Sequence, residues 1–517
     1  MTENTLNYTK TFGSNHNVNA LIGYSAQSFN SESSGLNGNQ YPDDLVSSLS
    51  AANSITSWKN QNAIAAWSLL SIYTRFNYNY KSKYLLSASL RRDGSSRFGW
   101  DNQWGLFPSL SAGWVVSDEA FMSNLSAISF MKLRAEYGEV GNFNIGNYTQ
   151  FGNISGADYV FGGSLAAGRS QTTLGNNYLT WETSKGLDIG LDIAAFKGRV
   201  NFSYDYYDKT TKGMLYQVNI PWTTGYSNIQ DNIGEFHMWG HEFNLNTVNL
   251  EGSFRWSSNF NLSINRNMVI KLGVNDQPIG AQDGWISQVN RTAVGYPIGQ
   301  FYVFLNDGVY MTQAEFDKGA KAEDSQVGTQ RFKDLNGDGK IDLKDRTNVG
   351  NPNPKFIYGF TNTFDFKKFD LNIVISGAYD QDKARTLYEW SEIVEGNFNV
   401  EKYVINRWRS PEKPGAGKIG RTLSGTNAWS SMGQADWIEK ASYLAVKNIT
   451  LGYTLPKIKN INKVRLFLSV QQALMLTNYM GPNPEASQFG LTGLREGIDD
   501  SAYPVPRTYA IGLDFKF

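Results

Sequence analysis

The residues with the clearest chemical potential lie in one acidic loop, Asp334-Leu-Asn-Gly-Asp-Gly-Lys-Ile-Asp-Leu-Lys-Asp345. Counted from its first residue, oxygen-bearing side chains fall at positions 1, 3, 5, 9 and 12, and position 7 offers a backbone carbonyl; these are Asp334, Asn336, Asp338, Asp342, Asp345 and, through its carbonyl, Lys340. Gly339 at position 6 permits a sharp turn, so the spacing is typical of an EF-hand-type Ca²⁺ loop with Asp in place of Glu at position 12. The pattern predicts a structural Ca²⁺ site. An ordinary solvated turn rich in Asp, Asn and Gly is the alternative.

The sequence offers little other chemistry. His237 and His241 have Glu235 and Glu242 nearby, but residues four apart on a strand lie about 13 Å apart, too far to share one metal ion. The chain has no cysteine, P-loop, GxSxG elbow or HExxH motif. These observations predict that the protein is not an enzyme.

Composition excludes further classes of protein. The 517 residues include 47 Lys+Arg and 47 Asp+Glu, and this neutral balance argues against nucleic-acid binding, which needs a cationic excess. No run of 18 apolar residues exists, so a membrane role requires a β-barrel. The first residues show no signal peptide, so either the protein stays inside the cell or the chain lacks its true N-terminus.

Alternation of apolar and polar residues dominates the chain. Residues 131–137, 187–193 and 254–264 each place apolar side chains on one face and polar ones on the other, as strands with one wet face do. Ser117–Met122 is instead expected to be a short helix with Ser117 as its N-cap. About fifteen strands are predicted, many longer than usual in soluble proteins, near residues 5–12, 17–29, 68–80, 83–92, 106–116, 130–138, 180–194, 198–208, 238–249, 253–266, 354–366, 369–379, 441–454, 463–474 and 506–517.

The connections alternate in length, which indicates a transmembrane barrel. Short turns are expected at residues 13–15, 81–83, 197–198, 250–252 and 367–368, and long polar loops at 31–66, 140–179, 209–237, 267–353 and 380–440. Short periplasmic turns and long extracellular loops are the outer-membrane barrel pattern. The last strand, Tyr509–Phe517, alternates throughout and ends in an aromatic residue, which is the feature that outer-membrane barrel assembly reads.

Several motifs carry a family resemblance. They are Asp93-Gly-Ser-Ser-Arg-Phe-Gly99, Trp104-Gly-Leu-Phe-Pro-Ser109, Gly113-Trp114, Lys132-Leu-Arg134, Tyr137-Gly138, Gly141-Asn142, Asp338-Gly339, Asp345-Arg346, Gly350-Asn-Pro352, Pro354, Tyr358-Gly-Phe360, Phe369-Asp-Leu371 and Pro506-Arg-Thr508. Over essentially its whole length, the chain resembles SusC/RagA TonB-dependent outer-membrane transporters of Bacteroidota.

The resemblance implies an all-β fold: part of an antiparallel transmembrane β-barrel whose fifteen strands correspond to roughly strands 8 to 22 of a 22-stranded barrel. Residues 1–517 would be the C-terminal part of this barrel, with 267–353 a long extracellular loop insertion carrying the Ca²⁺-type loop at 334–345. The plug domain, the signal peptide and the TonB-contacting segment would be missing.

The function implied is TonB-dependent import of a nutrient, an oligosaccharide or a peptide, across the outer membrane of a Gram-negative cell. The partners implied are a SusD-like surface lipoprotein, TonB through the missing N-terminal part, and outer-membrane lipid. Aromatic residues in the loops could stack on sugar rings or form the interfacial girdle of the barrel; they include Trp100, Trp104, Trp222, Trp285, Trp390, Trp408, Trp429 and Trp437. The alternative function is that of a secreted all-β protein that binds or hydrolyses glycans.

Overall fold

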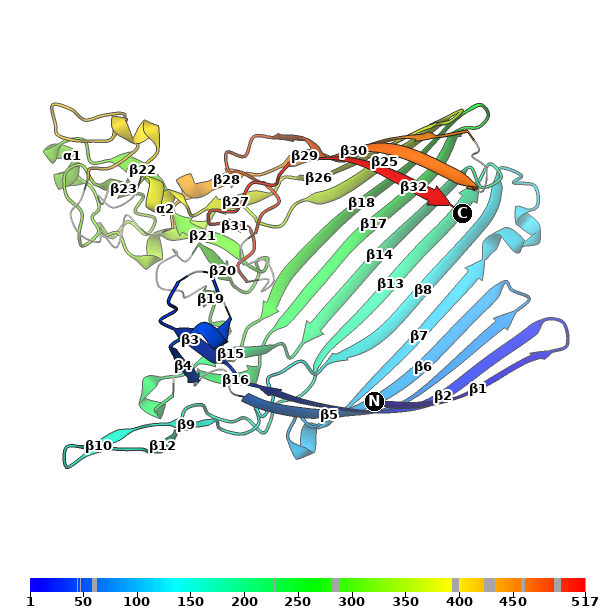
Figure 1. The fold of residues 1–517 in the computed structure, drawn as a ribbon, viewed down its shortest axis with the longest axis horizontal. Coiled ribbons are helices and arrows are strands. Elements are labelled where there is room, and N and C mark those ends of the chain that lie inside the picture. Colours follow the sequence, from blue (N-terminus) through cyan, green and yellow to red (C-terminus); the bar gives the residue numbers. More distant parts are fainter. Residues whose placement is uncertain are drawn as a thin grey trace. The chain divides into compact units, whose positions relative to one another are not determined.

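A single antiparallel sheet of fifteen long strands organises the protein, in the order in which the strands occur along the chain (Figure 1). The computed structural model describes residues 1–43, 45–46, 48–57, 63–226, 228–280, 289–392, 399–422, 433–456, 461–487 and 494–516. The long strands are β1 (Thr2–Phe12), β2 (His16–Ser33), β5 (Ala63–Tyr80), β6 (Tyr84–Ser95), β7 (Trp104–Val115), β8 (Ile128–Asn142), β13 (Glu182–Ala195), β14 (Val200–Lys212), β17 (Glu235–Leu250), β18 (Phe254–Lys271), β25 (Phe356–Phe366), β26 (Phe369–Tyr379), β29 (Tyr443–Thr454), β30 (Lys463–Thr477) and β32 (Thr508–Lys516). All fifteen predicted strands are confirmed.

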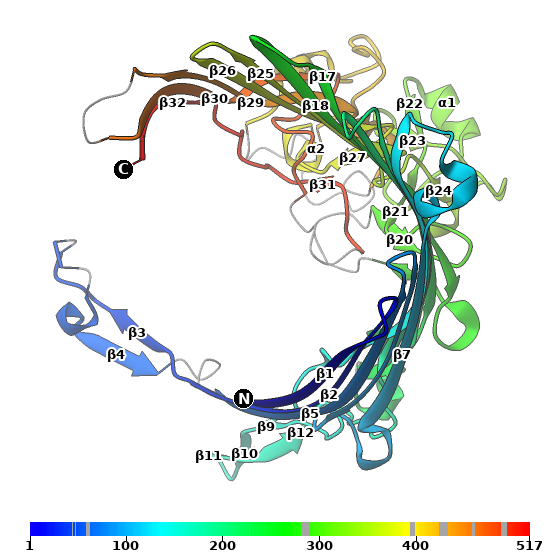
Figure 2. The same ribbon diagram turned by 90° about the vertical axis from the view of Figure 1, so that its right-hand side faces the viewer.

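The chain divides into two compact units. Unit 1 comprises residues 1–118, 133–189 and 209–235, and unit 2 comprises residues 119–132, 190–208 and 236–517. In unit 1, β1, β2, β5, β6 and β7 pair in sequence as antiparallel neighbours. In unit 2, β18, β25, β26, β29, β30 and β32 do the same and form one layer (Figure 2).

Tight turns join the strands at one end of each ladder. Lys81 and Ser82 between β5 and β6 both have a φ of 54°, and Phe196 and Lys197 between β13 and β14 have φ values of 52° and 58°. Two successive residues with positive φ are the hairpin geometry that matches the twist of the strands. At the other end, the connections after β2, β8, β14, β18 and β26 are long, as predicted; the exception to the alternation is that the β6–β7 connection (96–103) is shorter than the β7–β8 connection (116–127) at the turn end.

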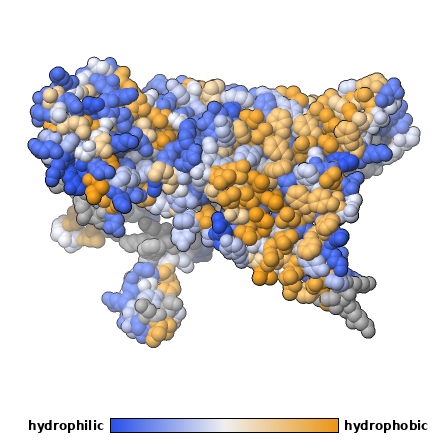
Figure 3. Space-filling model, turned by 90° about the horizontal axis from the view of Figure 1, so that it is seen from above, coloured by the Kyte–Doolittle hydropathy of each residue, from blue (hydrophilic) through white to orange (hydrophobic). Residues whose placement is uncertain are grey.

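The two faces of the sheet differ in polarity. On one face of unit 2, Leu451 lies opposite Leu468, which lies opposite Ile511, and these side chains are exposed. On the other face, the Arg465 guanidinium bridges the carboxylates of Asp370 (Nε–Oδ1, 2.9 Å) and Asp514 (Nη1–Oδ2, 3.1 Å). The space-filling view shows apolar residues gathered over the strands, whereas the loop end is largely hydrophilic (Figure 3).

The same division holds on β13. Leu187 and Ile189 are exposed, whereas Asp188 on the opposite face lies 3.4 Å from the Nη1 atom of Arg134. The exposed apolar side chains match the face that the sequence assigns to lipid. No helix among the described residues is long and apolar enough to cross a membrane.

The long loops contain their own secondary structure. The short strands are β3 (Leu36–Asn39), β4 (Ser54–Ser57), β9 (Ile154–Gly156), β10 (Tyr159–Phe161), β11 (Ser164–Ala166), β12 (Arg169–Gln171), β15 (Leu215–Asn219), β16 (Asn228–Asn232), β19 (Ile279–Gly280), β20 (Asn290–Thr292), β21 (Gln300–Phe304), β22 (Asn306–Val309), β23 (Gln330–Phe332), β24 (Arg346–Asn348), β27 (Asp382–Arg385), β28 (Ile438–Lys440) and β31 (Ile498–Asp499); the helices of the α class are α1 (Gln313–Lys318) and α2 (Tyr388–Ser391).

Three of these loops fold together in unit 2. The loop after β18, the loop after β26 and the loop after β30 share one hydrophobic cluster, formed by Val289, Phe301, Val303, Ala384 and Ile498. Strand β27 pairs with β28 and, in parallel, with β31, so backbone hydrogen bonds also join the loops. We call this assembly the loop module (Figure 1).

The helix predicted at Ser117–Met122 is wrong in detail. This segment forms two 3-10 turns, Val116–Asp118 and Ala120–Met122, and Glu119 is the N-cap of the second. Ser117 therefore lies inside the first 3-10 turn rather than at an N-cap, in a connection too short to propagate an α-helix.

The exposed apolar face makes a testable prediction. We expect Leu468→Arg to lower the free energy of unfolding in a bilayer by about 2–4 kcal/mol, because a cation on a lipid face must leave water. Gln471→Arg, on the polar face of the same strand, is the control and should change it little. Urea titration of the full-length protein in lipid vesicles measures both, and equal effects would contradict a lipid-facing assignment.

Candidate functional site

The predicted Ca²⁺ loop is an ordered series of turns in which carboxylates accept backbone N–H groups. The Asp334 carboxylate accepts from the amides of Gly337 (Oδ1, 2.6 Å) and Gly339 (Oδ2, 2.8 Å). Asn336 accepts from the amide of Asp338 at 2.9 Å, and Asp338 accepts from that of Lys340 at 2.9 Å. Gly337 and Gly339 have φ values of 76° and 80°, which side chains rarely tolerate.

The end of this loop is fixed to the protein. Asp345 is fully buried, and its carboxylate accepts from the amides of Leu335 and Asp342, both at 2.8 Å. Asp342 caps the turn Leu343–Asp345 by accepting from the Lys344 amide at 2.7 Å. Ile341 packs beside Phe304 in a small core. The loop is therefore held at both ends by contacts that need no metal.

The structure brings only part of the predicted donor set together. Asn336 and Asp338 are in contact, with Nδ2 and Oδ2 3.1 Å apart. Within the described ranges, no three acidic, cysteine or histidine side chains form a group that could hold a metal ion. Asp342 and Asp345 face each other's backbone rather than the carboxylate of Asp334.

The two neighbouring histidines have separate partners, as their spacing on a strand predicts. His237 Nε2 lies 2.9 Å from Asp208 Oδ2, and His241 Nδ1 lies 2.9 Å from Tyr204 Oη. Both contacts are made on the strands β14 and β17.

The tryptophans proposed for sugar stacking fall into distinct groups. Trp408 and Trp437 are buried in the loop module, so they serve as core residues. Trp100 and Trp222 are strongly exposed, at 89% and 80% of their surface. Trp104 is partly exposed and stacks under the Arg92 guanidinium. Trp285 and Trp429 lie outside the described residues, as does the side chain of Trp390.

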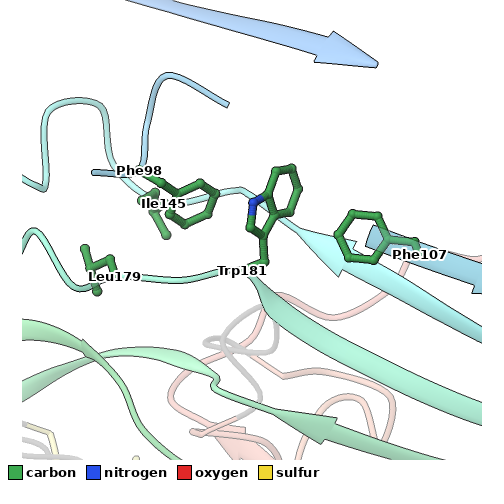
Figure 4. Packing of buried hydrophobic residues seen from close by; sticks show 5 residues of the cluster. All are labelled: Phe98, Phe107, Ile145, Leu179 and Trp181. Atoms are coloured by element: carbon green, nitrogen blue, oxygen red, sulfur yellow. The ribbon is translucent and has the colours of Figure 1, made fainter. Parts of the chain in front are cut away.

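The first family motif builds an aromatic cluster at the loop end of unit 1. Phe98, Phe107, Ile145, Leu179 and Trp181 are buried against one another (Figure 4). The Trp181 ring lies 5.1 Å from the ring of Phe98 and 5.3 Å from that of Phe107, edge-on to the latter.

Glycines of the same motifs make this packing possible. A Cβ atom on Gly141 would lie 2.0 Å from the Phe107 ring, and one on Gly105 would lie 2.4 Å from it. The motif residues therefore match in shape: the glycines leave the space that the Phe107 ring fills.

The second family motif ties loops of the loop module together. Asn351 donates its amide to Asp382 Oδ2 at 2.8 Å, and a Cβ on Gly350 would lie 2.7 Å from that same oxygen. Arg346 donates to the Tyr302 carbonyl, and burial lowers the pKa of its guanidinium to about 10. The motif thus positions loops rather than reacting groups.

A buried lysine forms the second junction of the loop module. Lys383 is almost fully buried and donates from Nζ to the Ala486 carbonyl. Burial lowers its pKa to about 8, although Asp499, Glu496 and Glu485 oppose the shift. Sequence reasoning missed this residue because nothing in its local pattern differs from that of a solvated loop.

These features define a class of protein: an antiparallel sheet with an exposed apolar face, tight turns at one end and folded loops at the other. The family model described as "TonB dependent receptor-like, beta-barrel" matches residues 1–471. The chain belongs to this family, whose members are outer-membrane proteins, and the SusC/RagA resemblance is confirmed.

Named relatives agree with the assignment. TonB-dependent receptor P3 of Formosa agariphila is 33% identical over 531 residues, which cover 100% of this chain and 52% of the relative. TonB-dependent receptor SusC of Bacteroides thetaiotaomicron is 30% identical over 468 residues, which cover 87% of this chain and 44% of SusC. The chain spans about half the length of the curated relatives it matches. They are receptors, in agreement with the prediction that the protein is not an enzyme.

Solved structures agree on the fold. The structure of the RagAB peptide transporter matches with a TM-score of 0.83 at 22% identity, covering 100% of this chain and 55% of that one. RagAB in its "open-open" state matches with a TM-score of 0.81.

Lys383 predicts a pH dependence of the loop module. A solvated lysine in the unfolded state keeps its pKa of 10.5 and binds the proton that the folded state releases above about 8. Stability should therefore rise as the pH rises through this window, by about 3 kcal/mol. Hydrogen exchange of residues 382–386 in the full-length protein, corrected for intrinsic rates, measures it. Lys383→Met should flatten the profile, and an unchanged profile would rule out Lys383 as the cause.

Proposed function

We propose that this chain is the C-terminal barrel portion of a TonB-dependent importer that carries an oligosaccharide across the outer membrane. The observation that carries the proposal is the fifteen-stranded ladder with folded loops at one end, which matches RagAB along the whole chain. Family membership argues against the alternative of a secreted glycan-binding or glycan-hydrolysing protein, because the apolar face of the sheet is exposed rather than packed.

The partners follow from the same resemblance. A SusD-like lipoprotein would deliver substrate at the loop end of the sheet, where the loop module presents a folded surface. TonB would act through a part of the protein outside this chain. The relatives named SusC and RagAB support this arrangement. The RagAB structure is described as a peptide transporter, so a peptide is the competing substrate class.

Two exposed tryptophans favour a sugar as substrate. Trp100 and Trp222 begin short 3-10 turns at the loop end of unit 1, and their rings are largely free of packing. A large flat apolar ring beside polar groups is suited to stacking on a sugar ring. A tryptophan with only a structural role is ordinarily buried in a core.

Substrate uptake tests both the activity and the substrate class. Cells that lack the full-length protein are complemented with wild type, Trp100→Ala or Trp222→Ala, and uptake of labelled oligosaccharides and peptides is measured. We expect wild-type uptake of oligosaccharides that stops when the proton gradient is collapsed, and about tenfold weaker apparent affinity in each variant, the loss of one aromatic contact.

Trp256→Ala is the matched control, because Trp256 lies on β18 near the tight turn that precedes it, at the end opposite the loops. It should take up substrate like wild type. Uptake of peptides alone would replace the sugar assignment, and uptake that survives collapse of the gradient would overturn TonB-dependent import.

We also propose that residues 334–345 bind Ca²⁺ as a structural ion. Each carboxylate oxygen has more than one acceptor site, so the amide contacts of Asp334 leave lone pairs for a cation. The donor order along the loop supports Ca²⁺ over Mg²⁺, since it offers six oxygen donors and Ca²⁺ accepts about 6–8 oxygen ligands in variable geometry. Binding requires Asn336, Asp338, the Lys340 carbonyl and the acids at 342 and 345 to turn toward Asp334.

Calorimetric titration of Ca²⁺ into the full-length protein tests this site. We expect binding with a Kd of about 10⁻⁴–10⁻³ M, the range of extracellular modules, and its loss in Asp334→Ala, Asp338→Ala. Asp317→Ala, Glu323→Ala removes two acids of the same loop segment outside the site and should bind like wild type. Absence of binding at millimolar Ca²⁺, or equal binding by both double variants, would reject the Ca²⁺ site. The loop would then be an ordinary solvated turn.

A further inference from the structure

An apolar groove lies on the exposed apolar face of unit 2, at the loop end of the strands. Its volume is about 860 Å³, within the range of about 300–1,000 Å³ typical of ligand pockets. Strands β18, β25, β26, β29 and β30 line it, chiefly through Leu262, Ile264, Phe356, Tyr358, Tyr379 and Leu476.

The register shows that these side chains share one face. Leu262 lies opposite Tyr358, which lies opposite Gly377, and Phe356 lies opposite Tyr379. The rings of Phe356 and Tyr379 stack with centroids 4.9 Å apart. The groove is therefore walled by aromatic and aliphatic side chains of adjacent strands.

Gly377 accounts for the hollow. A Cβ at this position would lie 2.4 Å from the Tyr358 ring, so the ring occupies the space that a side chain would need. Nearby, the ladder between β29 and β30 shifts register between Val446 and Asn448. Because Gly377 has no side chain, the Tyr358 ring lies directly over the backbone of β26 instead of standing beside a neighbour, and the apolar surface is lower at this point.

Lipid is the medium that meets this face. The groove continues into the exposed apolar band that includes Leu451, Leu468 and Leu474, and the protein is an outer-membrane protein by family. The groove lies where the strands run into the long loops, which is the end that borders the outer leaflet. Acyl chains are thus the apolar groups available to fill it.

Cations border the loop end of the groove. Arg266 follows Ile264 on the same face of β18 and donates from Nη1 to the Lys355 carbonyl at 2.8 Å. The Lys355 ammonium, next to Phe356, lies 2.6 Å from an oxygen of Asp380. Lys440 also contacts Asp380, at 3.2 Å.

The rim therefore has a positive excess. Lys355 and Lys440 pair with Asp380, and Lys440 also pairs with the buried Asp382 at 3.0 Å, so Arg266 is the third cation beside two carboxylates. Arg266 donates from Nη1 to the carbonyl oxygens of Asn265 and Lys355 rather than to a carboxylate. A guanidinium and an ammonium next to an apolar groove match a ligand with a phosphate head and a hydrocarbon tail.

We propose that this groove binds an acyl chain of a phosphorylated outer-leaflet glycolipid, with the lipid phosphate at Arg266 and Lys355. The groove lies on the exposed apolar face of the sheet, so this proposal does not depend on which nutrient is transported. The bound lipid would fill the hollow above Gly377 and hold the ends of β18 and β25 beside the loop module.

Native mass spectrometry of the detergent-purified full-length protein tests the proposal. The protein is titrated with diphosphoryl lipid A and, separately, with phosphatidylethanolamine. We expect one lipid A to be retained, with weaker retention of the zwitterionic lipid. Leu262→Trp, which fills the groove, should weaken retention about tenfold, the loss of roughly two buried methylene contacts. Arg266→Gln should weaken lipid A binding but not that of phosphatidylethanolamine.

Matched controls isolate the groove. Leu468→Trp adds the same ring to the apolar face outside it, and Arg255→Gln removes a cation at the opposite end of β18; both should retain lipid A like wild type. Variants are compared only after unheated electrophoresis shows that they are folded. If Leu262→Trp does not fold, the comparison of Arg266→Gln with Arg255→Gln still tests the proposal. Equal retention by groove and control variants, or no retained lipid in the wild type, overturns the proposal.

Discussion

The interaction on which the rest of this structure depends is the hydrogen-bond ladder between neighbouring long strands. In lipid, a backbone N–H or C=O group without a partner costs several kcal/mol, so each strand must be satisfied by the strands beside it. Pairing of consecutive strands achieves this with short turns on one side. Between β2 and β5 the register runs without interruption and pairs His16 through Ser33, whereas the ladders on the two sides of β29 each contain one register shift.

Once the ladder satisfies the backbone, the side chains are free to divide between two media. Ion pairs and amide networks collect on one face, as where Arg465 joins Asp370 and Asp514, while aliphatic and aromatic groups stay on the other. The loops are free of the membrane constraint and can bury a conventional core, which they do around Phe301 and Ile498. Chemistry and recognition therefore concentrate at the loop end.

The sequence was sufficient to predict the ladder but not the loop module. Apolar and polar residues alternate with a period of two over ten or more residues in many of these strands, so the alternation predicts them from local sequence. Val289, Ala384 and Ile498 come from three loops far apart in the chain and share no period, so their common core is invisible locally. For the same reason, Trp408 and Trp437 resembled binding residues although they are buried. The sequence of the acidic loop shows the order of its oxygen donors. It does not show which backbone amides the carboxylates accept from, because that depends on how the loop folds.

Pairs of a glycine and an aromatic residue recur in the sheet, and family motifs contribute to two of three such pairs. Gly141 admits the ring of Phe107, Gly377 that of Tyr358, and Gly512 that of Phe467, each with a would-be Cβ within 2.4 Å of the ring. At Gly141 the ring is enclosed by Trp181 and becomes a core. At Gly377 the Tyr358 ring lies over the backbone on the exposed face, where it forms part of the lining of the groove. The same close packing of an aromatic ring on a glycine thus has two results. Where other loops cover the ring it forms part of a rigid core, and where only lipid covers the ring it forms part of the proposed binding surface.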